Sequence, residues 1–247
     1  MRKININVNE YNTESIIKIQ KRKIWGISLA IMAFSFIVVV IGSLFFQYAL
    51  KVYLKTNIGS WTPQIIIFVG FFLFIILNLT SHYTKKINGS WLYIYYVLQL
   101  VAWTLILTSI LFYFTYIYEL DSITFLAIAL LPLGIILISG LIGYFQLIKE
   151  FFLYFFIGIL SVALLVMFFV SIFVFRITWY YSLVSVILIS AITVADIMQA
   201  KKEVENVVWM DSNIQFRFAF DLGIRLFISA AMLLFYILQL FMSSGKR

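Results

Sequence analysis

Residues 191–241 decide the fold of this chain, and they read AITVADIMQA (191–200), KKEVENVVWMDSNIQFRF (201–218) and AFDLGIRLFISAAMLLFYILQLF (219–241). The pattern predicts a membrane helix, a charged connector and a last membrane helix. Asp196 lies near the end of the first helix, and Asp221 lies near the start of the second. Because carboxylates inside hydrocarbon are costly and usually serve a function, this pair is the first candidate for a functional site.

The composition is that of a membrane protein. Of the 247 residues, 64% are hydrophobic and only 11% are charged, whereas about a quarter of the residues of an ordinary soluble domain are charged. Apolar runs of about 18 residues or more recur along the chain, and each is long enough to cross a hydrocarbon core of about 30 Å as a helix. We therefore expect an all-α, polytopic membrane helix bundle. It should be located in the cell membrane, in contact with the lipid bilayer.

Several functional classes are excluded or disfavoured by residue content. The formal charge of +8 comes from basic residues near the ends of apolar runs, where they act as topology signals, so nucleic acid is not an expected partner. The chain has no cysteine and one histidine, His82, which excludes disulfides and thiolate metal sites. Neither a GxxxxGK[ST] nor a GxGxxG motif occurs, so we expect no nucleotide cofactor.

Seven membrane spans are predicted between a polar tail (1–22) and a short basic tail (244–247), so that residues 23–243 form one transmembrane domain. If the last helix enters the membrane and turns back, the number of full spans is six. The predicted spans cover residues 24–50, 64–83, 91–116, 123–147, 152–173, 178–199 and 218–242.

The distribution of basic residues predicts the orientation. With the N-terminus in the cytoplasm, twelve Lys and Arg residues lie on the cytoplasmic side and five on the other, leaving Arg225 inside the last span. Because Lys and Arg favour the cytoplasmic side, this orientation is expected. Frequent Ile, Phe, Tyr, Asn and Lys indicate an AT-rich genome, and we interpret the chain as bacterial.

The fourth predicted span carries Gly134, Gly140, Gly143 and an internal proline, Pro132. Small residues allow close helix approach in lipid, so we expect the glycines to lie in helix contacts. Pro132 is interpreted as a static kink in this helix.

Asp196, Asp221 and Arg225 are the ionisable residues inside the predicted spans, with His82 at the end of the second. Asp221 and Arg225 are four residues apart, so they share a helix face and can pair. Asp196 and Asp221 are expected at equal depth, about three residues from their helix ends. Two close carboxylates do not both ionise cheaply and can share a proton, which predicts a pH-sensitive latch. The same two acids are also a candidate calcium site.

A purely structural interpretation of the acids remains open. Each is expected within about one turn of the membrane surface, where a carboxylate can reach water and end a helix. Asp221, near a helix N-terminus, also complements the helix dipole. For His82, at the interface beside Ser81 and Tyr83, a structural role is expected.

The last two spans resemble the C-terminal signature of the Bax inhibitor-1 family, also called the transmembrane Bax inhibitor motif family. That signature has an aspartate late in the sixth helix, then a glutamine, a loop, and an aspartate before the apolar run of the final helix. The matching residues here are Asp196 and Gln199 in ADIMQ and Asp221 in FDLGIRLF. The polar N-terminal tail, the seven-span count and the basic C-terminal end also fit, although the specific similarity covers only about fifty residues.

The resemblance implies seven helices with the last one central, and a pH-sensitive calcium-leak channel whose paired aspartates act as the sensor. By motif match, Asp196 and Asp221 carry that role. Family members often pair these acids with an arginine of the second helix, but residues 64–84 contain none. Arg225 or His82 is the expected replacement, and the chain resembles a divergent member.

Three functional classes remain in competition. The leading hypothesis is a passive, proton-gated cation pathway, with calcium as the expected ion. An intramembrane aspartyl protease also uses two membrane aspartates, and its second aspartate ends a GxGD motif. Here residues 217–221 read RFAFD, and the nearby glycine, Gly223, follows Asp221 and does not precede it. We therefore expect no enzyme. The alternative is a non-transporting membrane partner, for example a quality-control protease adaptor.

Overall fold

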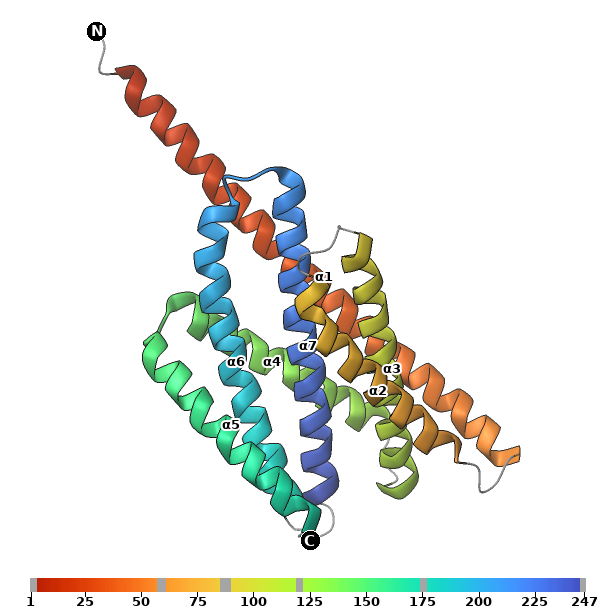
Figure 1. Ribbon diagram of the computed structural model, residues 1–247. Coiled ribbons are helices and arrows are strands. Elements are labelled where there is room, and N and C mark those ends of the chain that lie inside the picture. The colour runs from red at the N-terminus through yellow and green to blue at the C-terminus, as the bar shows by residue number, and fades with distance from the viewer. Residues whose placement is uncertain (1–3, 57–60, 85–89, 119–121, 174–176, 245–247) are drawn as a thin grey trace.

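The computed structural model describes residues 4–56, 61–84, 90–118, 122–173 and 177–244. These residues form α-helices and no β-strand, which confirms the all-α prediction (Figure 1). The helices are α1 (Ile4–Thr56), α2 (Thr62–Thr84), α3 (Ser90–Tyr118), α4 (Ser122–Phe145), α5 (Glu150–Phe173), α6 (Thr178–Val207) and α7 (Ser212–Ser244).

Six of these helices, all except α2, are long and apolar enough to cross a membrane. In α2 the apolar stretch found among the described residues is shorter, Gln64–Leu77. The last helix, α7, is one unbroken helix of 33 residues. It therefore does not enter the bundle and turn back, and the re-entrant alternative is wrong.

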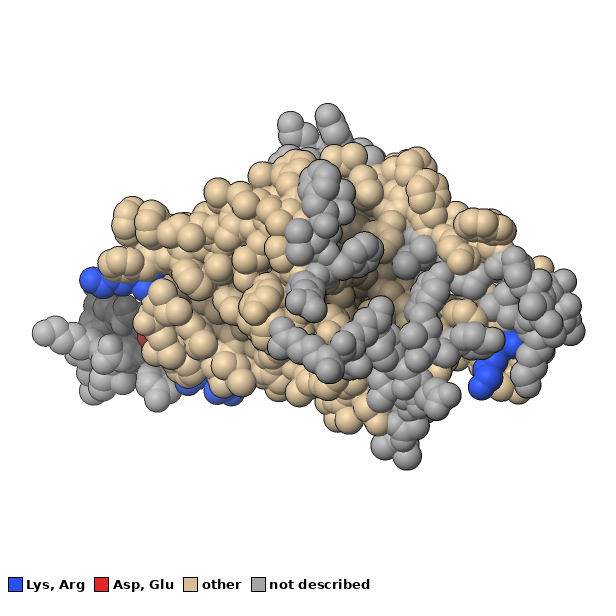
Figure 2. Space-filling view, turned by 90° about the horizontal axis from the view of Figure 1, so that it is seen from below, with Lys and Arg blue, Asp and Glu red and all other residues tan. Residues whose placement is uncertain are grey.

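The outer surface of the bundle is apolar, as lipid contact requires. Large hydrophobic side chains point outward on every helix, and Phe151 of α5, for example, is 76% exposed. Seen from below, the described surface consists almost entirely of uncharged residues, with Lys and Arg at its edges (Figure 2). Apolar surface of this extent indicates contact with a bilayer, since a soluble monomer rarely exposes large apolar patches.

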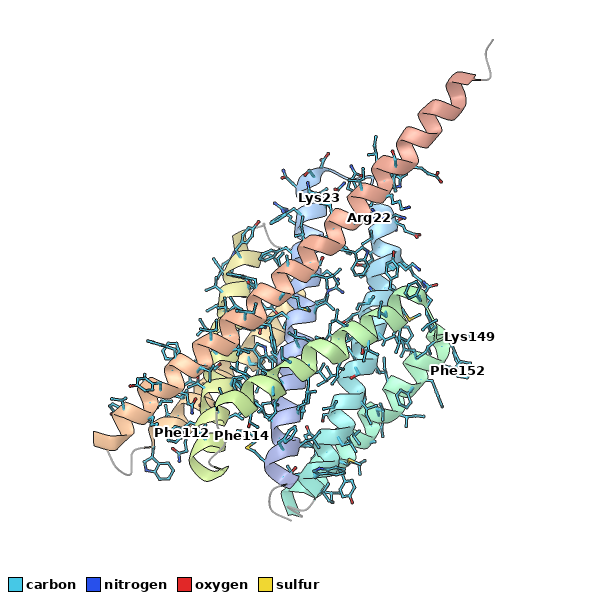
Figure 3. The ribbon with its side chains drawn as sticks, turned by 180° about the vertical axis from the view of Figure 1, so that it is seen from behind. Arg22, Lys23, Phe112, Phe114, Lys149 and Phe152 are labelled. Atoms are coloured by element: carbon cyan, nitrogen blue, oxygen red, sulfur yellow. The ribbon has the colours of Figure 1, made fainter. Side chains whose placement is uncertain are left out.

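The last helix, α7, lies at the centre of the bundle. It packs between α1 and α6 and also contacts α4 and α3, while α1 and α4 cross it obliquely (Figures 1 and 3). Ala230, Ala231, Leu233 and Leu234 of α7 are completely buried. The two alanines let neighbouring helices approach, and the two leucines fill the space between them.

Two glycines mark the closest helix approaches. A Cβ atom at Gly223 of α7 would lie 2.8 Å from the Ser28 carbonyl oxygen of α1, and a Cβ atom at Gly143 of α4 would lie 2.6 Å from the Val194 carbonyl oxygen of α6. Gly140 also faces α6, whereas Gly134 has no neighbouring atom in Cβ contact range. Two of the three glycines predicted to serve α4 contacts therefore do so. Pro132 lies inside α4 without ending the helix.

The charged connector predicted at 201–218 is largely helical. α6 continues to Val207 and α7 begins at Ser212, so the turn is confined to residues 208–211. Lys and Glu favour helices, and the extended turns bury Val204 and Val207 against Ile24 of α1 and Ala219 of α7. This small apolar core explains why the helices extend past the apolar spans.

The polar N-terminal tail is helical as well. α1 starts at Ile4 and runs for 53 residues without a break, so that most of the segment 1–22 continues the first span beyond the bundle (Figure 1). At the other end α7 reaches Ser244, and the basic residues Lys246 and Arg247 lie outside the described residues.

Candidate functional site

Asp221 and Arg225 form an ion pair on α7. Arg225 Nε lies 3.2 Å from Asp221 Oδ2, and the two side chains are 23% and 33% exposed, respectively. Arg225 Nε makes no hydrogen bond within the described part of the chain, so the contact is electrostatic and lacks hydrogen-bond alignment. The pairing is the one that the four-residue spacing predicts.

Arg225 also reaches across to α6. Its Nη2 atom lies 3.9 Å from Glu203 Oε2, and Gln199 Nε2 donates a hydrogen bond of 2.7 Å to Glu203 Oε1. Helical side chains lean toward the N-terminus of their own helix. On these antiparallel helices the arginine therefore leans toward the α6–α7 turn and the glutamate away from it, which brings them together. We call Gln199, Glu203, Asp221 and Arg225 the polar cluster.

Asp196 shares a face of α6 with this cluster. It is partly buried, and it precedes Gln199 and Glu203 by three and seven residues, which is one and two helical turns. Asp196 lies eleven residues before the end of α6, and Asp221 lies nine residues after the start of α7. At about 1.5 Å per residue, these positions are about 16 and 13 Å along their helices from the α6–α7 turn.

The expected distance of the acids from their helix ends, about three residues, is wrong. Both helices continue through the predicted connector, so the carboxylates lie well inside helical segments. α4 packs closely on the turn of α6 that carries Asp196, because Gly143 lies against the Val194 carbonyl and the Ile197 side chain. This contact makes the Asp196 turn of α6 sensitive to the spacing between α4 and α6.

The last turns of α6 connect it to its neighbours through charged residues. Lys201 Nζ donates to the Tyr144 carbonyl at the C-terminal end of α4, at 2.8 Å, and lies 5.1 Å from the centre of the Tyr144 ring. Lys202 pairs with Glu150 at the start of α5, and Glu205 lies 3.9 Å from Lys21 of α1. Together with Glu203 and Arg225, these contacts link the end of α6 to four helices.

The sequence interpretation missed Glu203. Glu203 falls in the predicted charged connector, where its seven-residue spacing from Asp196 carries no meaning. A helix continued past Gln199 places both acids on one face. The side chain of His82 lies outside the described residues. Arg225 contacts Asp221 on its own helix and Glu203 on α6.

The described residues contain no group of three or more His, Cys, Asp or Glu residues that would hold a metal ion. Asp196 and Asp221 do not form such a group with Glu203. The positive charge of Arg225 beside Asp221 also opposes a cation at that carboxylate in this arrangement.

No protein-family model, curated protein or solved structure matches this chain.

Proposed function

We propose that this chain is a seven-span protein of the cell membrane with a cytoplasmic N-terminus, and that it forms a pH-sensitive, passive cation pathway similar to those of the Bax inhibitor-1 family. The observation that supports this best is the position of Arg225 between Asp221 of α7 and Glu203 of α6. This bridge joins the two helices that carry the paired aspartates. The acids act as the sensor and have no catalytic role.

The bridge responds to pH through its carboxylates. Asp221 and Arg225 lie on the same helix, so only the contact between Arg225 and Glu203 crosses from α7 to α6. Loss of the charge on Glu203 therefore loosens α6 from α7. Both pairs are partly exposed, and each is therefore worth about 1 kcal/mol or less after solvent screening. The one pair that joins the two helices shifts a two-state equilibrium by about fivefold at most, since about 1.4 kcal/mol corresponds to a factor of ten.

Asp196 provides the second acid of the pathway. Once the contact between Glu203 and Arg225 is broken, α6 and α7 separate near Asp196, and the Asp196 carboxylate, which is not part of the bridge, becomes available to a passing cation. Calcium is the proposed ion because it prefers oxygen ligands and tolerates irregular coordination. It is proposed as the transported ion and not as a resident cofactor.

Flux measurements in liposomes test the proposal. The protein is reconstituted with an enclosed calcium dye, and flux is recorded at several pH values for Asp196→Asn, Asp221→Asn and the control Asp211→Asn, which changes an exposed acid of the α6–α7 turn. We expect the first two to change the flux and flatten its pH dependence, and the control to match the parent. If Asp196→Asn and Asp221→Asn both behave like the parent, the acids are not the sensor.

A second function is favoured by α5. This helix packs mainly against α6, and Leu153 is its one buried hydrophobic residue among those described. A helix so loosely attached offers a surface to another membrane protein, which is the arrangement expected of an adaptor. A stoichiometric membrane partner that co-purifies with the chain, together with an absence of ion flux, would favour this alternative.

A further inference from the structure

Three helices extend beyond the α4–α5 turn and pack together. Figure 1 shows the α6–α7 turn and the N-terminal part of α1 projecting past the level at which α4 meets α5. Their shared apolar core is Ile24 of α1, Val204 and Val207 of α6, Val208 of the turn and Ala219 of α7. We call this region, residues 14–27, 202–207 and 208–219, the cap.

The cap contains a small pocket between α1 and α7. The two helices touch at Ser28 and Gly223 and diverge from there toward the α6–α7 turn, which leaves a cavity of about 60 Å³. A single water molecule needs about 10 to 15 Å³ of such a cavity, so a group of about five non-hydrogen atoms fits. Its lining residues are Lys23, Ile24, Ile27, Ser212, Gln215 and Phe216.

The pocket offers a positive charge that the described residues do not neutralise. Lys23 is exposed at its rim, and it forms no ion pair within the described part of the chain. Figure 3 shows Lys23 with Arg22 beside the α6–α7 turn. The Ser212 hydroxyl adds a hydrogen-bond donor, whereas the Gln215 amide already donates to the Val208 and Met210 carbonyls. These groups suit a small anion.

Taking the α4–α5 turn as the edge of the hydrocarbon core places the pocket at the depth of the lipid headgroups. The ion pair between Lys202 and Glu150 aligns α6 with the α4–α5 turn, and α6 ends five residues farther on, at Val207, which is about 8 Å. The headgroup layer on each side of a bilayer is about 5 to 8 Å thick. The pocket residues of α7 then lie in this interval. Trp209 at the turn is 70% exposed, and tryptophans are enriched at headgroup depth.

We propose that the pocket between α1 and α7 binds the phosphate of an anionic phospholipid, with Lys23 as its counter-ion, Ser212 as a hydrogen-bond donor and Phe216 beside the glycerol backbone. Bound lipid would hold α1 and α7 together above their crossing point. This site is separate from the polar cluster and does not depend on the cation pathway.

Native mass spectrometry of the full chain tests the proposal. The detergent-solubilised protein is mixed with phosphatidylglycerol or with phosphatidylcholine, and the lipid-bound fraction is compared for the parent, Lys23→Gln and Arg22→Gln. The two substitutions remove one positive charge each from adjacent positions of α1, but Lys23 lines the pocket and Arg22 does not. Thermal unfolding of each variant without lipid confirms that it folds.

We expect the parent to bind phosphatidylglycerol in preference to phosphatidylcholine. Lys23→Gln should weaken this binding about tenfold, the usual effect of one lost charge-assisted contact, and Arg22→Gln less than twofold. Equal losses in the two variants would show a diffuse surface charge and no site. Equal binding of the two lipids, displacement by millimolar inorganic phosphate, or a protein that occupies the pocket in a Lys23-dependent manner would each overturn the lipid assignment.

Discussion

Gly143→Ala is expected to push α6 away from α4 at the turn that carries Asp196. The added methyl group would lie 2.6 Å from the Val194 carbonyl oxygen and 3.2 Å from Ile197 Cβ, whereas ordinary contact begins near 3.4 Å. Because one obstacle is backbone, the clash is relieved only by moving the helices apart by most of an ångström. Overpacking of this kind costs about 1 to 3 kcal/mol, and the helix propensity of alanine returns up to about 1 kcal/mol. A net loss of about 1 to 2 kcal/mol is expected.

Gly134→Ala is the matched control for this prediction. It lies on the same helix and gains the same helix propensity, but nothing lies within 4 Å of its added Cβ. Reversible unfolding of both variants in mixed micelles, titrated with a denaturing detergent, gives their free energies of unfolding relative to the parent. Gly134→Ala should be neutral or slightly more stable. If the two variants are equally stable, the close approach of α4 and α6 is refuted, together with its role in positioning Asp196.

Arg225→Met should lower the free energy of unfolding by about 1 to 2 kcal/mol near neutral pH, because it leaves two partly exposed carboxylates without their counter-charge. A variant that is as stable as the parent would contradict the bridge. Lys201→Met removes the contacts with the Tyr144 carbonyl and the Tyr144 ring at the end of α4. The free energy of unfolding should fall by about 0.5 to 1 kcal/mol in the same assay, and Lys201→Arg should keep most of this stability. Gln215→Leu removes both hydrogen bonds that close the α6–α7 turn. The free energy of unfolding should fall by about 1 to 2 kcal/mol, and amide hydrogen exchange should become faster only in residues 206–212. Unchanged exchange there would show that the turn does not depend on this amide.

The hydrophobic pattern alone determined the helical class and most helix positions. Apolar runs long enough to cross a bilayer leave the backbone no alternative to helix, because hydrocarbon offers no other hydrogen-bond partner. The pairing of Asp221 with Arg225 also followed from the sequence, since it is local to one helix and depends only on a spacing of four residues.

The packing of one helix on another was decided by the tertiary structure. The segment 201–207 is polar enough to read as a connector, and it is helical because Val204 and Val207 meet Ile24 of α1, a residue far away in sequence. That extension placed Glu203 opposite Arg225 and set the depth of Asp196. Of three glycines on α4, only the two that face α6 make a close contact, and nothing local to the sequence distinguishes them. Helix formation is a property of short segments, whereas the meeting of charged side chains from two helices depends on where the whole bundle holds those helices.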